Sequence, residues 1–313
     1  MRIAFNSLSE SLINHLGALS AQQNRLQNQA ATGQRISQLE DDPTAMRRVL
    51  NLQVSGSQVA QYQQNITNLQ QQATSSYDAM NGLKTISARA GEIATLADGT
   101  KSPQELQTYA TEVTQLIQQA AQLMNSQYQG NYLFGGTRTD QPPFVVATDA
   151  NGNVTSVTYQ GNDSVPSAEI AAGSTLSVQV PGANTSSTGP TGLITDSRNG
   201  ADFFNHLIAL QNHLQAGDTT TIQSTDNAAL AKDEDNITLQ IGHNGVVQSQ
   251  LDAASTVASA QASSLTQMVS QDADANMAET LTQLSATQTA FQAALQSGAS
   301  LLNQNQSLLY YIQ

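Results

Sequence analysis

Apolar residues near both ends of the chain recur at alternating intervals of three and four, the spacing of helices that pack along one seam. The pattern covers the N-terminus up to residue 33, then 59–83, 106–123, 247–268 and 281–312. It predicts long helices in the first and last thirds of the chain. The apolar residues of the two terminal seams are Leu12, Leu16, Leu19, Leu26, Leu281, Leu284, Phe291, Leu295, Leu302, Leu309 and Ile312.

A break in the helical pattern is expected at Asp41, Asp42 and Pro43. Proline disfavours helical backbone at the residue before it, whereas an aspartate in that position can cap a new helix that has proline at its first residue. These three residues therefore predict a joint between two helices. A matching joint is expected near residues 272–276, where the heptad phase changes.

The centre of the chain, about residues 138–200, has a different character. Short β-type runs at 144–146, 154–159 and 175–180 are separated by turns rich in Gly, Pro, Asn and Thr, and Asn151-Gly152 between the first two is a hairpin signal. A further helix is expected after residue 203, ending at Gly217. The predicted fold class is mainly α with an inserted β domain.

The last predicted helix has no charged residue from Leu281 to Gln313, and charged residues make up only 11% of the whole chain, against about 25% in ordinary domains. A helix that faces water on one side usually carries charge there. We interpret the two terminal seams as assembly seams, enclosed by neighbouring protein. A core helix of a single domain is the alternative interpretation.

The net charge of −13 and the lack of any Lys/Arg cluster exclude nucleic acid and anionic membranes as expected partners. No apolar run reaches the length of a transmembrane helix, and residues 1–18 lack the apolar core of a signal peptide. We therefore expect that an extracellular location would be reached without a cleaved signal peptide. The absence of cysteine excludes disulfides and thiolate chemistry.

Motifs of catalysis or of cofactor and metal binding are not apparent. The residues 272–283 begin like a calcium loop, but Met277 replaces the required glycine and Gln283 the required glutamate. Gly135-Gly136-Thr137 lacks a Walker pattern. We predict no catalytic, cofactor or metal site and interpret the scattered histidines as polar surface residues; they are His15, His206, His213 and His243.

Several segments resemble known flagellar proteins. Residues 31–36 (ATGQRI) followed by 41–45 (DDPTA) resemble the N-terminal signature of the flagellin superfamily. Residues 128–144, with Tyr-Leu-Phe-Gly-Gly and a later Pro-Phe, resemble the hook-associated proteins that join hook to filament. Residues 242–254 and 272–279 resemble the family's C-terminal motifs. The acidic run Asp233-Glu234-Asp235 departs from that pattern and weakens the expectation of a continuous helix there.

The resemblance implies a chain folded back on itself in three domains. Residues 1–44 and 273–313 would form an inner coiled-coil domain lining the export channel, in a flagellin-like antiparallel arrangement of both chain ends. Residues 45–137 and 218–272 would form a helical shaft, and residues 138–217 an outer β-rich domain with one helix.

The function expected from the resemblance is that of a non-enzymatic structural subunit at the hook–filament junction, exported by the flagellar type III apparatus. Its implied partners are copies of itself in a ring, the preceding hook-associated junction protein, flagellin, and an export chaperone at the C-terminal region. Two alternatives remain: flagellin itself, the bulk filament subunit, or a type III-secreted coiled-coil tip protein. The latter normally carries a membrane-active apolar stretch, which this sequence lacks.

Overall fold

A computed structural model of the protein describes residues 2–38 and 40–310, with side chains at 10–38 and 40–300. The chain divides into two compact units. The first unit comprises Met1–Gln58 and Ala260–Gln313, and the second comprises Val59–Ser259. None of the helices in the described part of the chain combines the length and apolar character needed to span a bilayer.

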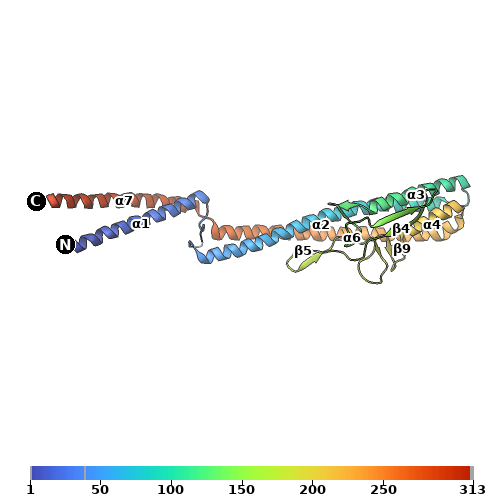
Figure 1. The fold of residues 1–313 in the computed structure, drawn as a ribbon, viewed down its shortest axis with the longest axis horizontal. Helices are drawn as coiled ribbons and strands as arrows, with labels where there is room; N and C mark the ends of the chain where they lie inside the picture. Colours follow the sequence, from blue (N-terminus) through green and yellow to red (C-terminus); the bar gives the residue numbers. More distant parts are fainter. Residues whose placement is uncertain (1, 39, 311–313) are drawn as a thin grey trace. The chain divides into compact units, whose positions relative to one another are not determined.

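The first unit is built from helices. Helix α1 (Arg2–Thr32) and helix α7 (Met277–Tyr310) run side by side in opposite directions (Figure 1). The unit is completed by the start of α2 (Pro43–Leu96) and the end of α6 (Asn227–Ala273). The helices expected at both chain ends are therefore present, and the expected breaks fall at Pro43 and between Ala273 and Met277.

The second unit contains the remainder of α2 and α6 together with α3 (Pro103–Met124) and α4 (Phe203–Ala216). Helix α3 begins with a capping box, in which Ser102 and Glu105 satisfy each other's backbone N–H groups. Helix α4 ends at Gly217, which has a φ of 70°, as the sequence predicts. A short helix α5 (Thr219–Thr221) and a π-helical turn η1 (Ile222–Asp226) lead into α6.

Nine short strands lie between α3 and α4 in the described residues, and they form small separate sheets. The predicted hairpin is present, with Phe144 paired to Tyr159 and a turn that contains Gly152. The predicted run at 175–180 is strand only up to Leu176. Its partner β5 was not predicted. The strands are β1 (Gln127–Tyr128), β2 (Asn131–Tyr132), β3 (Phe144–Thr148), β4 (Val154–Tyr159), β5 (Ala168–Ala171), β6 (Ser174–Leu176), β7 (Ala183–Asn184), β8 (Thr195–Asp196) and β9 (Ala201–Asp202).

The β region of the second unit shares one hydrophobic core with the helices. Phe144 of β3 packs against Tyr159 of β4 and Phe204 of α4, with ring centroids 5.1 and 5.3 Å apart. Leu133 and Phe134, from the Tyr-Leu-Phe-Gly-Gly motif, are completely buried in this core. The motif that carried the family resemblance therefore has a packing role. This common core makes the fold mainly α with an inserted β region, as predicted.

Polar side chains of α6 hold the loop around β8 and β9. Asp233 accepts hydrogen bonds from the backbone N–H of Asp202 and from His206 Nδ1, both at 2.8 Å. Asn236 Nδ2 donates to the carbonyl oxygens of Gly192 and Leu193. The carboxyl of Asp233 is fully buried and partnered, so the acidic run does not interrupt the helix. The acidic run therefore does not weaken the helix as the sequence analysis expected, and α6 is continuous from Asn227 to Ala273.

Two histidines also differ from the sequence-based interpretation. His206 lies opposite Asp233, and His213 Nδ1 lies 2.7 Å from Asp226 Oδ2. Both imidazoles are part-buried, so they are packing residues of α4. His15 and His243 are exposed, as expected.

Candidate assembly surface and the adjacent joint

The predicted seam of α1 faces α7. Leu12, Leu16 and Leu19 are half-buried and Leu26 is fully buried, whereas the residues between these positions are mostly exposed. The seam follows from the heptad spacing because α1 has a single apolar stripe to bury. The structure thus brings the α1 seam residues onto one face, toward α7.

The predicted seam of α7 divides into two rows. Leu284 and Phe291 are half-buried in the helix pair. Leu281 and Leu295 are 52% and 48% exposed. Leu302 and Leu309 lie on α7, but their side chains are outside the described residues, and Ile312 lies wholly outside them.

Small residues explain why α7 turns two leucines outward. Thr280 and Thr287 are 6% exposed, and Gly298 is buried where it meets Leu12. A Cβ atom on Gly298 would come within 2.8 Å of the Leu12 side chain. Small side chains let two helices approach closely, so they occupy the contact and the larger leucines lie at its edge.

We call Leu281, Gln288 and Leu295 the outer row of α7; they are spaced by seven residues and all are exposed. Ile13 of α1 is also exposed, at 67%. No charged residue occurs in α7 beyond Leu281. An exposed leucine row at heptad spacing on an uncharged helix is suited to packing against another helix.

Asp41, Asp42 and Pro43 form the start of α2 and the turn before it. The Asp41 carboxylate accepts hydrogen bonds from the backbone N–H groups of Ser37 and Gln38. Asp42 caps α2 by accepting from the N–H groups of Thr44 and Ala45, at 3.1 and 3.0 Å. These N–H groups lower the pKa of Asp41 and of Asp42. The stabilisation that they provide is present above the ordinary pKa of 3.8 and is lost in stronger acid.

The two linkers of the first unit are tied together by their backbones. The N–H of Arg35 donates to the carbonyl of Ala273 at 2.7 Å, and the N–H of Ala275 donates to the carbonyl of Gly33 at 2.8 Å. Gly33, with a φ of 72°, ends α1 and turns the chain into this bridge. The segments before α2 and after α6 therefore form one joint.

An ion pair adds to the joint. Arg48 binds both carboxylate oxygens of Asp272, at 3.0 and 2.7 Å, and Arg35 donates to the backbone carbonyl of Asp272. The Arg48 guanidinium lowers the pKa of Asp272. The sequence pattern does not reveal this pairing, because the two partners lie 224 positions apart.

We expect Arg48→Gln to loosen the joint and Arg47→Gln to leave it unchanged. Arg48 holds Asp272, whereas none of the described residues forms an ion pair with Arg47. An exposed ion pair contributes only weakly to stability, so hydrogen exchange should become roughly two- to fivefold faster at Arg35 and Ala275. Exchange measured by mass spectrometry on peptides covering both linkers tests this; equal rates in the two variants would contradict it.

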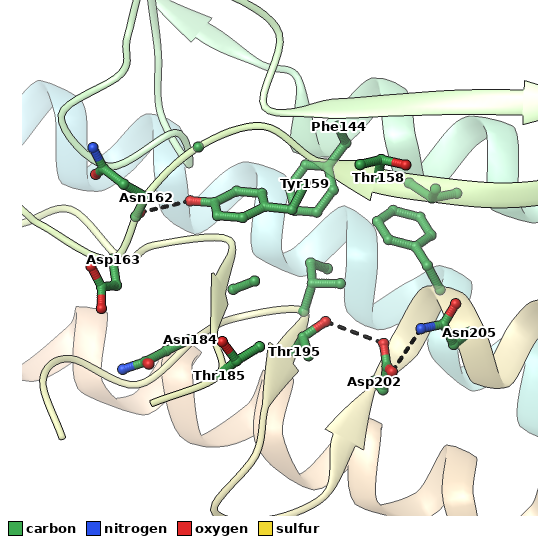
Figure 2. A pocket seen from close by; sticks show the side chains of 15 residues that line it. Phe144, Thr158, Tyr159, Asn162, Asp163, Asn184, Thr185, Thr195, Asp202 and Asn205 are labelled. Atoms are coloured by element: carbon green, nitrogen blue, oxygen red, sulfur yellow. Dashed lines mark hydrogen bonds between the residues drawn. The ribbon is translucent and has the colours of Figure 1, made fainter. Parts of the chain in front are cut away.

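A hollow of about 640 Å³ lies in the β region of the second unit (Figure 2). Asp202 faces it, but its carboxylate already accepts from Thr195 Oγ1 and Asn205 Nδ2. Tyr159 donates its hydroxyl to backbone carbonyls, and burial raises its pKa to about 12. These groups hold strands and helix together and do not pair a nucleophile with a base.

Among the described residues, no cluster of three or more His, Cys, Asp or Glu side chains is placed to hold a metal ion. The segment that begins like a calcium loop has structural roles: Asp272 pairs with Arg48, and Asn276 caps α7 by accepting from the N–H of Glu279.

The N-terminal part of the chain matches a known protein family. Residues 3–139 match the family described as the bacterial flagellin N-terminal helical region. This range runs from α1 through α3 and includes the Tyr-Leu-Phe-Gly-Gly motif.

A curated relative and several solved structures carry hook-associated names. The chain is 29% identical over 163 residues to flagellar hook-associated protein 3 of Salmonella typhimurium. The aligned region covers 51% of this chain and 51% of the relative. The chain therefore matches about half the length of that protein. Its fold is similar to a putative flagellar hook-associated protein from Vibrio parahaemolyticus (TM-score 0.63, 22% identity, 75% of this chain and 100% of that one). It is also similar to FlgL of Bacillus cereus (TM-score 0.55, 19% identity, 70% and 99%). These matches confirm the resemblance to hook-associated proteins of the flagellin superfamily and the predicted fold class.

Proposed function

We propose that this chain is a non-enzymatic structural subunit of the bacterial flagellum, located outside the cell where the hook joins the filament. The observation that carries the proposal is the surface of the α1–α7 pair. Leu281, Leu295 and Ile13 are about half exposed or more on helices with very little charge. Such a surface is costly in water and is stabilised when neighbouring subunits cover it. The hook-associated names of the relatives support the location.

The domain order proposed for this subunit is the one that the resemblance implies. Residues 1–44 with 273–313 form the inner domain, 45–137 with 218–272 the shaft, and 138–217 the outer β-rich domain. The helix ends at Thr32 and Ala273 and the start of α2 at Pro43 support the inner boundaries. The joint that ties residues 33–36 to 273–275 supports a single connection between the inner domain and the shaft.

The partners follow from this position. The outer row of α7 contacts neighbouring copies in a ring. The remaining faces of the ring contact the preceding hook-associated junction protein on one side and flagellin on the other. Before export, a chaperone holds the uncharged C-terminal region. Export by the flagellar type III apparatus is part of the same proposal.

Flagellin is the second candidate, because the matched family region is that of flagellins. Growth of filaments distinguishes the two. A junction subunit should restore filaments to a flagellated cell that lacks its own hook–filament junction protein, and the purified chain should not form long filaments. Electron microscopy of cells and of the concentrated pure protein provides both readouts. Long filaments of the pure chain would identify a bulk filament subunit instead.

A further inference from the structure

The chain contains four Asn-Gly pairs, the dipeptide in which an asparagine side chain is most prone to spontaneous deamidation. In such a pair the backbone nitrogen of glycine can attack the side-chain amide carbon of asparagine, and glycine has no side chain to block that approach. The reaction also needs an asparagine side chain that is free to turn and a backbone that can adjust. The pairs are Asn81-Gly82, Asn151-Gly152, Asn199-Gly200 and Asn244-Gly245.

Two of the pairs are protected by helices. Asn81-Gly82 lies within α2 and Asn244-Gly245 lies within α6. The glycine N–H inside a helix is bonded to the carbonyl four residues earlier, so attack requires local opening of the helix. Asn244 is also buried, and its side chain donates to the carbonyl of Ala73 and accepts from Gln248.

The two remaining pairs lie in exposed turns with similar backbones. Gly152 has a φ of 87° and Gly200 a φ of 76°. The N–H of Gly152 donates to the carbonyl of Asp149, and that of Gly200 donates to the carbonyl of Asp196, each at 3.1 Å. A Cβ atom on either glycine would meet no atom within 4 Å. The backbone therefore does not distinguish these two pairs.

The asparagine side chains do distinguish them. Asn199 Oδ1 accepts from the N–H of Ala201 at 3.0 Å, and its Nδ2 donates to Asn236 Oδ1 at 2.8 Å. Asn236 is itself buried, so Asn199 must break two hydrogen bonds before it can react. Among the described residues, none anchors the Asn151 side chain in this way. Asn151 is bound through its backbone N–H, which donates to Asp149 Oδ1.

We propose that Asn151 is a site of spontaneous deamidation and that the fold protects the other three Asn-Gly pairs. The Gly152 nitrogen forms a bond to Asn151 Cγ, and the side-chain nitrogen leaves as ammonia together with the proton of the glycine N–H. Water then opens the resulting succinimide ring at either carbonyl, giving aspartate or isoaspartate. The net change is the uptake of one water and the loss of one ammonia, so no enzyme, oxidant or cofactor is needed.

The structure confines the effect of this modification to the hairpin turn. The Asp149 carboxylate accepts from the N–H groups of Asn151 and Asn153, so a new carboxylate at position 151 places like charges close together. Isoaspartate also adds one atom to the backbone of the turn. Strand β4 begins directly afterwards at Val154, which is buried and bonded through both its N–H and its carbonyl to the Gln211 side chain. The turn should therefore loosen while the second unit stays folded.

The first test measures deamidation at all four pairs in one sample. The full chain is incubated at physiological temperature and mildly alkaline pH, and aspartyl and isoaspartyl peptides are followed over time by mass spectrometry. Asn151 should react at least about tenfold faster than the other three asparagines, because their reactions require local opening. In chain unfolded with urea, all four should react at similar rates. Comparable rates in the folded chain, or fastest reaction at Asn199, would overturn the proposal.

Matched variants assign the reaction to one residue. Asn151→Gln keeps the amide but places its carbon one bond further from the glycine nitrogen, so the fast phase of isoaspartate formation should disappear. Asn199→Gln should leave the fast phase unchanged. A fast phase that persists in Asn151→Gln would overturn the assignment. The aged wild-type chain should keep the Tm of the fresh chain by circular dichroism, and a fall in Tm that follows the modification would contradict an effect limited to the turn.

Discussion

Leu295→Asp is expected to abolish assembly into the flagellum while the second unit stays folded. Leu295 is 48% exposed on α7, so the free chain does not depend on it for packing. In the assembly proposed above, it would lie against a neighbouring copy. Because about half of the Leu295 side chain is already covered in the free chain, each contact would lose roughly half of the about 1.5–3 kcal/mol that full burial of a leucine provides, and the new carboxylate must also be desolvated. In the proposed ring, the loss would be repeated at every copy.

Two controls separate assembly from folding. Leu295→Met keeps an apolar side chain of similar volume and should restore filaments, because such swaps are well tolerated. Thermal unfolding followed by circular dichroism should give the same Tm for the wild type and Leu295→Asp. Normal filament growth by Leu295→Asp would rule out the outer row as an assembly surface. A large fall in Tm would instead show that Leu295 supports the free chain.

His206→Leu is expected to destabilise the second unit by roughly 2–4 kcal/mol. The Asp233 carboxyl is fully buried, and His206 Nδ1 at 2.8 Å is its side-chain partner. Removing one member of such a pair leaves the other desolvated and under-bonded. His243→Gln, a change at an exposed histidine of the same unit, should have no measurable effect. Urea unfolding of the variants and the wild type gives the difference.

The same pair makes stability depend on pH. The hydrogen bond that His206 donates to Asp233 raises the pKa of His206, and the carboxylates of Asp202 and Asp226 act in the same direction. A histidine with a raised pKa contributes its full stabilisation below its ordinary pKa of 6.5 and loses it as pH rises through the raised value. His206→Gln keeps a neutral donor but cannot be charged. The stability difference between wild type and His206→Gln should therefore shrink above pH 6.5, and a constant difference would contradict the ion pair.

The sequence alone determined the features that depend on neighbouring residues. The heptads of residues 12–33 identified both the helix and its buried face. A helix with one apolar stripe turns that stripe toward the neighbouring helix. Asp42 and Pro43 marked the start of α2, since capping and the missing proline N–H act within one turn. Asn151-Gly152 marked a hairpin for the same local reason.

Tertiary structure decided whatever depends on residues far apart in the chain. The rotation of α7 was set by the fit of Gly298 against Leu12 of α1, so Leu281 and Leu295 point outward although they follow the same heptad period as Leu284 and Phe291. Arg48 pairs with Asp272, and Asp233 pairs with His206, although the partners are far apart in the sequence. A one-dimensional pattern shows which residues share a face. The pattern does not show which of two apolar rows the neighbouring helix will cover, because that depends on the side-chain volumes on both helices.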